Sequence, residues 1–164
     1  MIQHRSVLFL TTCAAWAMGW CGSQVGVESA DGTVKVFILA GQSNMKHIIR
    51  DVRRDLGAPH LPFVIAALGN NGSTPASGGM LAVREAQMSM NDVPEFQENV
   101  RAFRTDVLVD QAAEELFPTW RDNFQQWQKV GSDRPYHYFG SAIWFTRIGH
   151  AAGEAMLELL KDGD

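Results

Sequence analysis

The chain has 164 residues, of which 46% are hydrophobic and 20% are charged, and its formal net charge at pH 7 is −4. This length allows one domain with a substantial core rather than two. The small negative charge gives no reason to expect nucleic acid as a partner, and the arginine clusters Arg50/Arg53/Arg54 and Arg101/Arg104 are interpreted as solvated faces.

The first 22 residues have the features of an export signal. Two basic residues, His4 and Arg5, precede an apolar run over residues 6–18, and small residues follow. The run is too short to span a bilayer as a helix; the alternative is a buried N-terminal helix. We expect a signal peptide over residues 1–22, export to the periplasm or the extracellular space, and no membrane span in the mature chain. Both cysteines lie in this segment, so the mature chain is expected to have no disulfide.

A flexible leader and a buried strand are expected next. Residues 23–32 are mostly polar or glycine, which is typical of a mobile segment. The run Val34–Ala40 has too many apolar residues for a strand with one solvated side, which predicts a strand of a parallel sheet buried on both faces. A helix over about Met45–Leu56 follows at once, because its apolar residues recur with helical spacing at Met45, Ile48, Ile49, Val52 and Leu56.

Ser43 lies on the turn between this strand and this helix. Free backbone N–H groups and the helix dipole favour negative charge at such a turn. A serine nucleophile needs this environment, because its attack on an ester produces an oxyanion. The alternative is a structural role, in which the hydroxyl caps the helix by accepting a hydrogen bond from the N2 or N3 amide.

The rest of the chain predicts an α/β domain. The order strand, helix, strand indicates a right-handed βαβ unit, and functional loops in such sheets gather at the carboxyl ends of the strands. The Ser43 turn and the loop Gly69–Gly79 both follow strands, so a shared site is expected there. The elements predicted after the first helix are a buried strand over Leu61–Leu68, a helix over about Gly79–Met90, an edge strand over Asn99–Thr105 and a long helix over about Gly140–Leu160.

Two features of the second half allow more than one interpretation. Aromatic residues recur at spacings of three to four between Asp110 and Gln128, which favours packing, with a sugar-stacking platform as the alternative. Gly149 and Gly153 lie one turn apart in the last predicted helix and would allow close contact with the sheet. The aromatic residues are Phe117, Trp120, Phe124 and Trp127.

His137 is the second candidate catalytic residue. It lies on the loop before the last helix, and a loop at the carboxyl edge of the sheet can bring a base within hydrogen-bond reach of Ser43. Taken alone, a histidine between two tyrosines can equally be structural. The chain's other histidines lack paired spacing and companion ligands, so no metal site is expected.

Two blocks of sequence are distinctive. The first, Gly41–Met45, reads Gly-Gln-Ser-Asn-Met, and the second, Tyr136–Ala142, reads Tyr-His-Tyr-Phe-Gly-Ser-Ala. In these blocks the chain resembles the sialate O-acetylesterase-like carbohydrate esterases of the SGNH hydrolase superfamily. Shorter matches extend the resemblance over most of residues 33–160; they are Arg50–Pro59, Leu61–Ile65, Ile148–Gly149 and Ala155–Leu157.

The resemblance implies a fold and a reaction for residues 33–164. The fold would be a three-layer α/β/α sandwich around a parallel, flavodoxin-like sheet. The reaction would remove acetyl groups from a saccharide or polysaccharide without a cofactor or a metal, with Ser43 as nucleophile and His137 as base. Asp133 is the candidate orienting acid, although family members usually carry that aspartate at the position held here by Arg134. The residues expected around the oxyanion are Gly41, Gln42 and Asn44.

The chain departs from the family after its serine block. Family members carry a long stretch there, with a glycine and an asparagine that complete the oxyanion hole, whereas here Met45 runs almost directly into the next helix. The domain is therefore expected to be internally shortened and its activity impaired, because losing one oxyanion donor typically costs ~10²–10³ in rate. Two alternatives stay open: a non-catalytic esterase remnant that binds glycans or has no function, and an exported structural domain in which Ser43 caps a helix.

Overall fold

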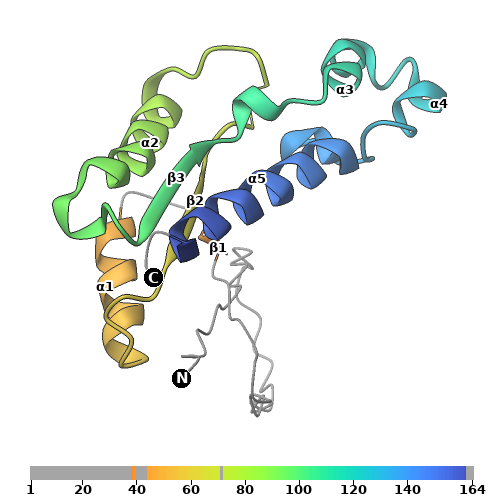
Figure 1. Ribbon diagram of the computed structural model, residues 1–164. Helices are drawn as coiled ribbons and strands as arrows, with labels where there is room; N and C mark the ends of the chain where they lie inside the picture. The colour runs from red at the N-terminus through yellow and green to blue at the C-terminus, as the bar shows by residue number, and fades with distance from the viewer. Residues whose placement is uncertain (1–37, 40–43, 71, 162–164) are drawn as a thin grey trace, which may run out of the picture.

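The computed structural model describes residues 38–39, 44–70 and 72–161 (Figure 1). The predicted signal peptide, the leader, most of the first strand and Gly41–Ser43 lie outside these residues. The strands are β1 (Ile38–Leu39), β2 (Phe63–Ala67) and β3 (Val100–Arg104). The α-helices are α1 (Met45–Asp55), α2 (Gly78–Met88), α3 (Gln111–Leu116), α4 (Phe124–Trp127) and α5 (Ala142–Lys161). Short 3-10 helices are η1 (Ser89–Asp92), η2 (Pro94–Phe96), η3 (Asp106–Leu108), η4 (Phe117–Thr119) and η5 (Tyr138–Gly140).

The three described strands form a parallel sheet in the order β1-β2-β3. All five residues of β2 are buried, as its run of apolar residues predicts. Strand β3 lies at one edge of the described sheet, and Asn91 of η1 covers it by bonding both the N–H (2.7 Å) and the carbonyl (3.0 Å) of Ala102. The prediction of an α/β chain with a parallel sheet is confirmed.

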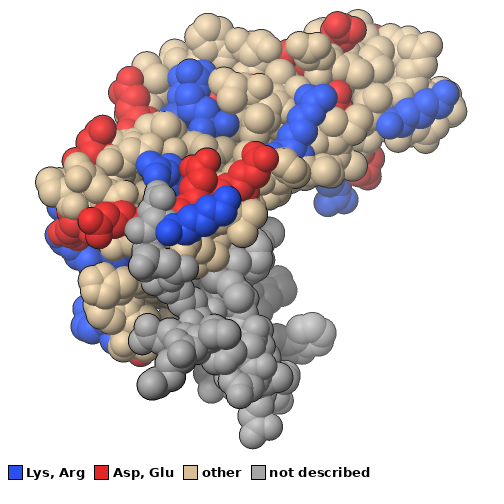
Figure 2. All heavy atoms as spheres, viewed as in Figure 1, with Lys and Arg blue, Asp and Glu red and all other residues tan. Residues whose placement is uncertain are grey.

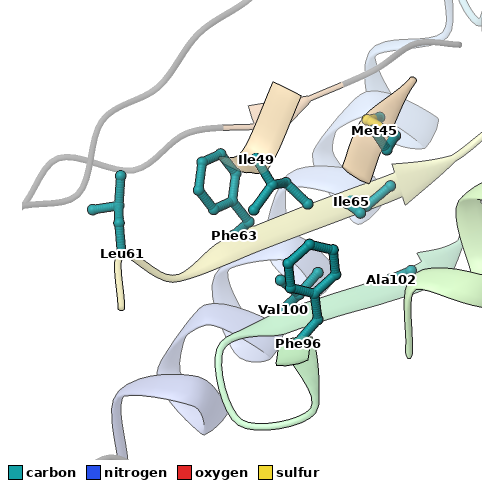
Figure 3. Close-up of a cluster of buried hydrophobic side chains, with 8 residues drawn as sticks. All are labelled: Met45, Ile49, Leu61, Phe63, Ile65, Phe96, Val100 and Ala102. Atoms are coloured by element: carbon teal, nitrogen blue, oxygen red, sulfur yellow. The ribbon is translucent and has the colours of Figure 1, made fainter. Parts of the chain in front are cut away.

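Helices cover both faces of this sheet (Figure 1). On one face, Met45 and Ile49 of α1 pack against Phe63 and Ile65 of β2, with Phe96 completing the cluster (Figure 3). Because side chains alternate along a strand, Val64 points to the other face, where it meets a stripe of α5. Burying each large apolar side chain contributes about 1.5–3 kcal/mol. The α5 stripe consists of Ala152, Ala155, Met156 and Leu159.

Helix α1 ends as its sequence predicts, but its buried face differs. Gly57 adopts a left-handed conformation (φ +60°) just past the helix, where glycine is favoured. Leu56, predicted to be buried, is 53% exposed, and Arg53, assigned to the solvated face, is buried. The reason is that the Arg53 guanidinium donates to the carbonyl of Leu61 (3.1 and 2.8 Å), so the helix turns this charged side chain inward.

The aromatic stretch packs rather than lying open to solvent. Trp127 is fully buried, and Phe117 stacks on Phe139 with their ring centroids 4.5 Å apart. These rings form a cluster with Trp144 at the start of α5. Packing explains the spacing of these aromatic residues, although Phe124 is 40% exposed.

The expected approach of α5 to the sheet through its glycines is wrong. Gly149 and Gly153 are both exposed, and a Cβ added to either would meet nothing within 4 Å. Helix α5 contacts the sheet instead through its stripe of alanine, methionine and leucine residues, and the two glycines lie on its exposed side. None of the described helices is long and apolar enough to cross a membrane.

Candidate functional site

The candidate site lies where the parallel strands end. Ser43 follows β1 by four residues and is outside the described residues, as are Gly41 and Gln42. Asn44 is described: it is exposed, its side chain makes no capping hydrogen bond, and its carbonyl accepts from the N–H of Ile48 (3.0 Å) as α1 begins. The roles predicted for this turn therefore stay predictions.

Thr105, directly after β3, links the carboxyl ends of β2 and β3 to the His137 loop. Its hydroxyl donates to the carbonyl of Ala67 at the end of β2 (2.6 Å) and lies 3.1 Å from the hydroxyl of Tyr138. Its carbonyl accepts from the indole N–H of Trp144 (2.9 Å). Because Tyr138 is the residue next to His137, these bonds fasten the His137 loop to the carboxyl ends of β2 and β3.

The backbone of the His137 loop is unusual. Tyr138, Phe139 and Gly140 have consecutive positive φ values of 50°, 56° and 64°. A residue other than glycine held in this region typically costs about 1–3 kcal/mol, and such residues cluster at functional sites. Packing supplies the compensation here, because Phe139 is buried and its carbonyl accepts from the N–H of Ser132 (3.1 Å).

His137 itself is exposed, and its imidazole makes no hydrogen bond with a described residue. The loop is thus fixed by its neighbours, while the exposed imidazole has no partner within the described part of the chain. A general base needs this combination, since it must be positioned and still have a nitrogen available.

Asp133, the candidate orienting acid, is exposed and forms no hydrogen bond or ion pair with His137 in the described part of the chain. Its role stays a prediction. A different carboxylate is buried beneath the loop: Asp110, which accepts a 2.5 Å hydrogen bond from the hydroxyl of Ser141. The same hydroxyl oxygen accepts from the N–H of Trp144 (3.2 Å), so Ser141 caps α5 and joins it to the start of α3.

Sequence reasoning missed Asp110 and Thr105. A weak signal exists for both: Asp110 precedes a helix and Thr105 follows a strand, and polar residues at such boundaries often bond to nearby backbone. Their partners lie 31 and 38 residues away, at Ser141 and Ala67. That separation is why the sequence pattern alone does not reveal them.

The ion-paired carboxylate of Asp106 lies next to Thr105 at the carboxyl end of the sheet. Asp106 forms ion pairs with Arg84 (2.9 Å) and with Arg104. The hydrogen bond from Arg104 is the main reason that the pKa of Asp106 is lowered, and burial opposes it. Gly69 passes so close that an added Cβ would lie 2.2 Å from the N atom of Asp106, so this position has no room for a side chain.

The loop after β2 contributes one unpaired polar atom. The Oδ1 atom of Asn70 is buried without a hydrogen-bond partner among the described residues. Directly after Gly72, Ser73 donates its N–H (2.5 Å) and hydroxyl (2.7 Å) to Glu114, which ties the loop to α3. The described residues contain no group of three or more histidine, cysteine, aspartate or glutamate side chains that could hold a metal ion.

No family model, no curated protein and no solved structure matches this chain.

Proposed function

We propose that the chain is an exported serine esterase of SGNH type that removes acetyl groups from a saccharide. Ser43 is the nucleophile and His137 the general base. The observation that supports this proposal is the fastening of the His137 loop at Thr105, at the carboxyl end of a parallel sheet that also contains β1, four residues before Ser43. Strands β1 and β3 flank β2, so at ~4.8 Å per neighbouring pair these two strands lie about 10 Å apart.

The reaction follows from these two side chains. A nitrogen of the His137 imidazole takes the proton of the Ser43 hydroxyl while its oxygen attacks the acetyl carbon. The carbonyl electron pair moves to oxygen, and the backbone N–H of Ser43 donates to the resulting oxyanion. When the intermediate collapses, the sugar oxygen leaves with the proton from the imidazolium. Water, activated by the same imidazole, then releases acetate.

The carboxylates of the loop region have separate roles in this proposal. Asp133 is exposed, close in sequence to His137 and able to orient the imidazole. Asp110 is buried and acts on structure, because its bond with Ser141 holds the start of α5 under the loop. The oxyanion has few donors in this chain, so we expect a slow enzyme.

Hydrolysis of 4-nitrophenyl acetate and of acetylated xylan by the purified chain tests the proposal. We expect Ser43→Ala and His137→Ala each to reduce the rate to background. Ser89→Ala and His150→Ala are matched controls on exposed helical positions, and both should keep the wild-type rate. Equal rates in the wild type and in Ser43→Ala would reject the catalytic role, and no turnover by the wild type would favour the non-catalytic remnant.

A further inference from the structure

A hollow of about 640 Å³ opens at the amino ends of β2 and β3, between α1 and the turns that precede these strands. We refer to it as the amino-edge hollow. It lies at the other end of the strands from Thr105, about 20 Å away at ~3.3 Å per strand residue, since six residues separate Asn99 from Thr105, and is therefore separate from the proposed esterase site. Its polar lining includes Arg50, Arg53, Arg54, His60, Glu95, Gln97, Glu98 and Asn99.

Arg53 forms the rigid part of this lining. Its guanidinium lies 5.4 Å from the ring centroid of Phe63 and 5.4 Å from that of Phe96. Its Nε and Nη2 atoms donate to the carbonyl of Leu61, and Nη2 also donates to the side-chain oxygen of Asn99 (2.6 Å). Burial lowers the pKa of Arg53, and the charge of Glu95 raises it; an arginine stays protonated at neutral pH.

One end of this guanidinium is unused. The Nη1 atom of Arg53 donates to no residue in the described part of the chain, while the other two nitrogens are fully engaged. Two N–H groups are thus available on a side chain whose position is already fixed by two rings and by fixed acceptors. A ligand that binds them loses little to side-chain ordering, which favours affinity.

The neighbouring charges limit the kind of ligand that fits. Arg50 makes a two-point contact with Glu95, at 2.7 Å for each bond, and Arg54 bonds to Asp51 and Asp55 on its own helix. Of the three arginines that line the hollow, Arg53 is the one whose guanidinium forms no ion pair with a carboxylate in the described part of the chain. Acidic and basic groups also alternate on the face in Figure 2, without a large patch of one sign. One negative charge matches this single guanidinium, whereas a second negative charge would be repelled by Glu95 and Glu98.

We propose that the amino-edge hollow binds a small carboxylate that carries hydroxyl groups. One carboxylate oxygen can accept a charge-assisted hydrogen bond from Arg53 Nη1, and the exposed His60 and Arg54 would hold the other oxygen. Glu98 and Gln97 supply acceptors on the rim for hydroxyl groups. The spacing of Arg50, Arg53 and Arg54 at i, i+3 and i+4 places these side chains along one side of α1, so the helix presents a binding face.

Titration of the full chain with sodium glucuronate, followed by NMR, tests this proposal. We expect saturable shifts of the Arg53 side-chain signal and of the Gln97 and Asn99 amides. Glucose, which has the hydroxyl groups without the carboxylate, should cause no saturable shift. Removing one charge-assisted contact by Arg54→Gln or His60→Gln should weaken binding about tenfold, which corresponds to the loss of one such hydrogen bond.

Arg121→Gln is the matched control, because Arg121 lies over Trp120, away from the hollow, and its loss should leave the affinity unchanged. Arg53→Lys keeps the charge but loses the available Nη1 donor, and it should bind glucuronate at least as weakly as Arg54→Gln does. If Arg53→Lys does not fold, the two rim variants, Arg54→Gln and His60→Gln, decide whether the hollow binds the carboxylate. Equal affinity for glucose and glucuronate, unchanged affinity in both rim variants, or no saturable shift at these residues would overturn the proposal.

Discussion

The two ends of the sheet are held together by different chemistry. At the amino end, the buried guanidinium of Arg53 bonds to the carbonyls of Leu61 and Asn99 and so joins the starts of β2 and β3. At the carboxyl end, the neutral hydroxyl of Thr105 joins β2 and β3 and also contacts Tyr138. A charged side chain thus anchors one end of the sheet directly, whereas at the other end the anchoring residue is Tyr138, the neighbour of His137, and the His137 imidazole bonds to none of the described residues.

The two ends of the sheet also differ in which residues adopt left-handed backbone conformations. The turn before β2 uses one left-handed glycine, Gly57, a low-cost solution for a sharp turn. The His137 loop places two non-glycine residues, Tyr138 and Phe139, in the left-handed region and compensates with buried aromatic packing. Strain that packing must offset is the expected mark of a loop held for function.

Trp144→Ala should produce the largest loss of stability, because it removes a fully buried indole that packs at the carboxyl end of the sheet. We expect a loss of about 3–5 kcal/mol in the free energy of unfolding, from the cavity and from the lost bond to Thr105. Urea denaturation measures it. Trp144→Phe keeps most of the volume and should lose less; equal losses in the two variants would show that packing of this ring does not hold this end.

Arg53→Met tests the amino end. The variant keeps a long apolar side chain between Phe63 and Phe96 but leaves the buried carbonyl of Leu61 without its donors, so we expect a loss of about 2–3 kcal/mol. The carbonyl of Asn99 keeps the N–H of Phe63 as its donor (2.9 Å). Arg54→Met, on the exposed side of α1, should change stability by no more than ~0.5 kcal/mol. Similar values for the two variants would mean that Arg53 is not the anchor.

Ser141→Ala tests the join beneath the His137 loop. The change removes the donor to the buried carboxylate of Asp110 and the cap on the N–H of Trp144, and we expect a loss of about 1–2 kcal/mol. Thermal unfolding measures it, with Ser89→Ala as the exposed control. A loss no greater than that of the control would contradict a structural role for the Asp110–Ser141 pair.

Asp106→Asn should have the smallest effect, and that effect should depend on pH. The pKa of Asp106 is lowered in the folded chain, chiefly by its bond with Arg104. The ion pair therefore stabilises the fold above the unfolded pKa of about 3.9, and this contribution is lost as the pH falls through the lower folded value. Because Arg104 is half-exposed, solvent reduces the contribution to less than ~1 kcal/mol. Unfolding at pH 7 and pH 3 should show the variant losing less stability on acidification than the wild type; equal losses would contradict the assignment.

The sequence predicts the elements of this fold better than their contacts. The apolar run around β2 and the spacing of α1 predict a strand and a helix within a few residues, because burial imposes those periods directly. The same periodicity predicts that Arg53 is exposed, because it places charged side chains on the solvent side of the helix. It cannot predict that the Arg53 guanidinium donates to the carbonyl of Leu61. It also misplaces Gly149, whose exposure depends on how α5 is rotated against the sheet.

The candidate site is predictable only in part, for a related reason. His137 stands out in its sequence block, and the order of strands predicts which edge its loop approaches. The bonds that hold the loop, from Thr105 and Asp110, join residues more than thirty positions apart. No local pattern encodes them, and the positive φ values at Tyr138 and Phe139 follow from those distant contacts rather than from residue type.

Labelling with a fluorophosphonate, which reacts with activated serine hydroxyls, tests the central claim most directly. Peptide mass spectrometry of the labelled full chain should find the modification on Ser43. The label should be lost in Ser43→Ala, be strongly reduced in His137→Ala and persist in His150→Ala, the exposed histidine of α5. Equal labelling of Ser43 in the wild type and in His137→Ala, or no labelling of Ser43 in the wild type, would contradict a catalytic pair at this edge of the sheet.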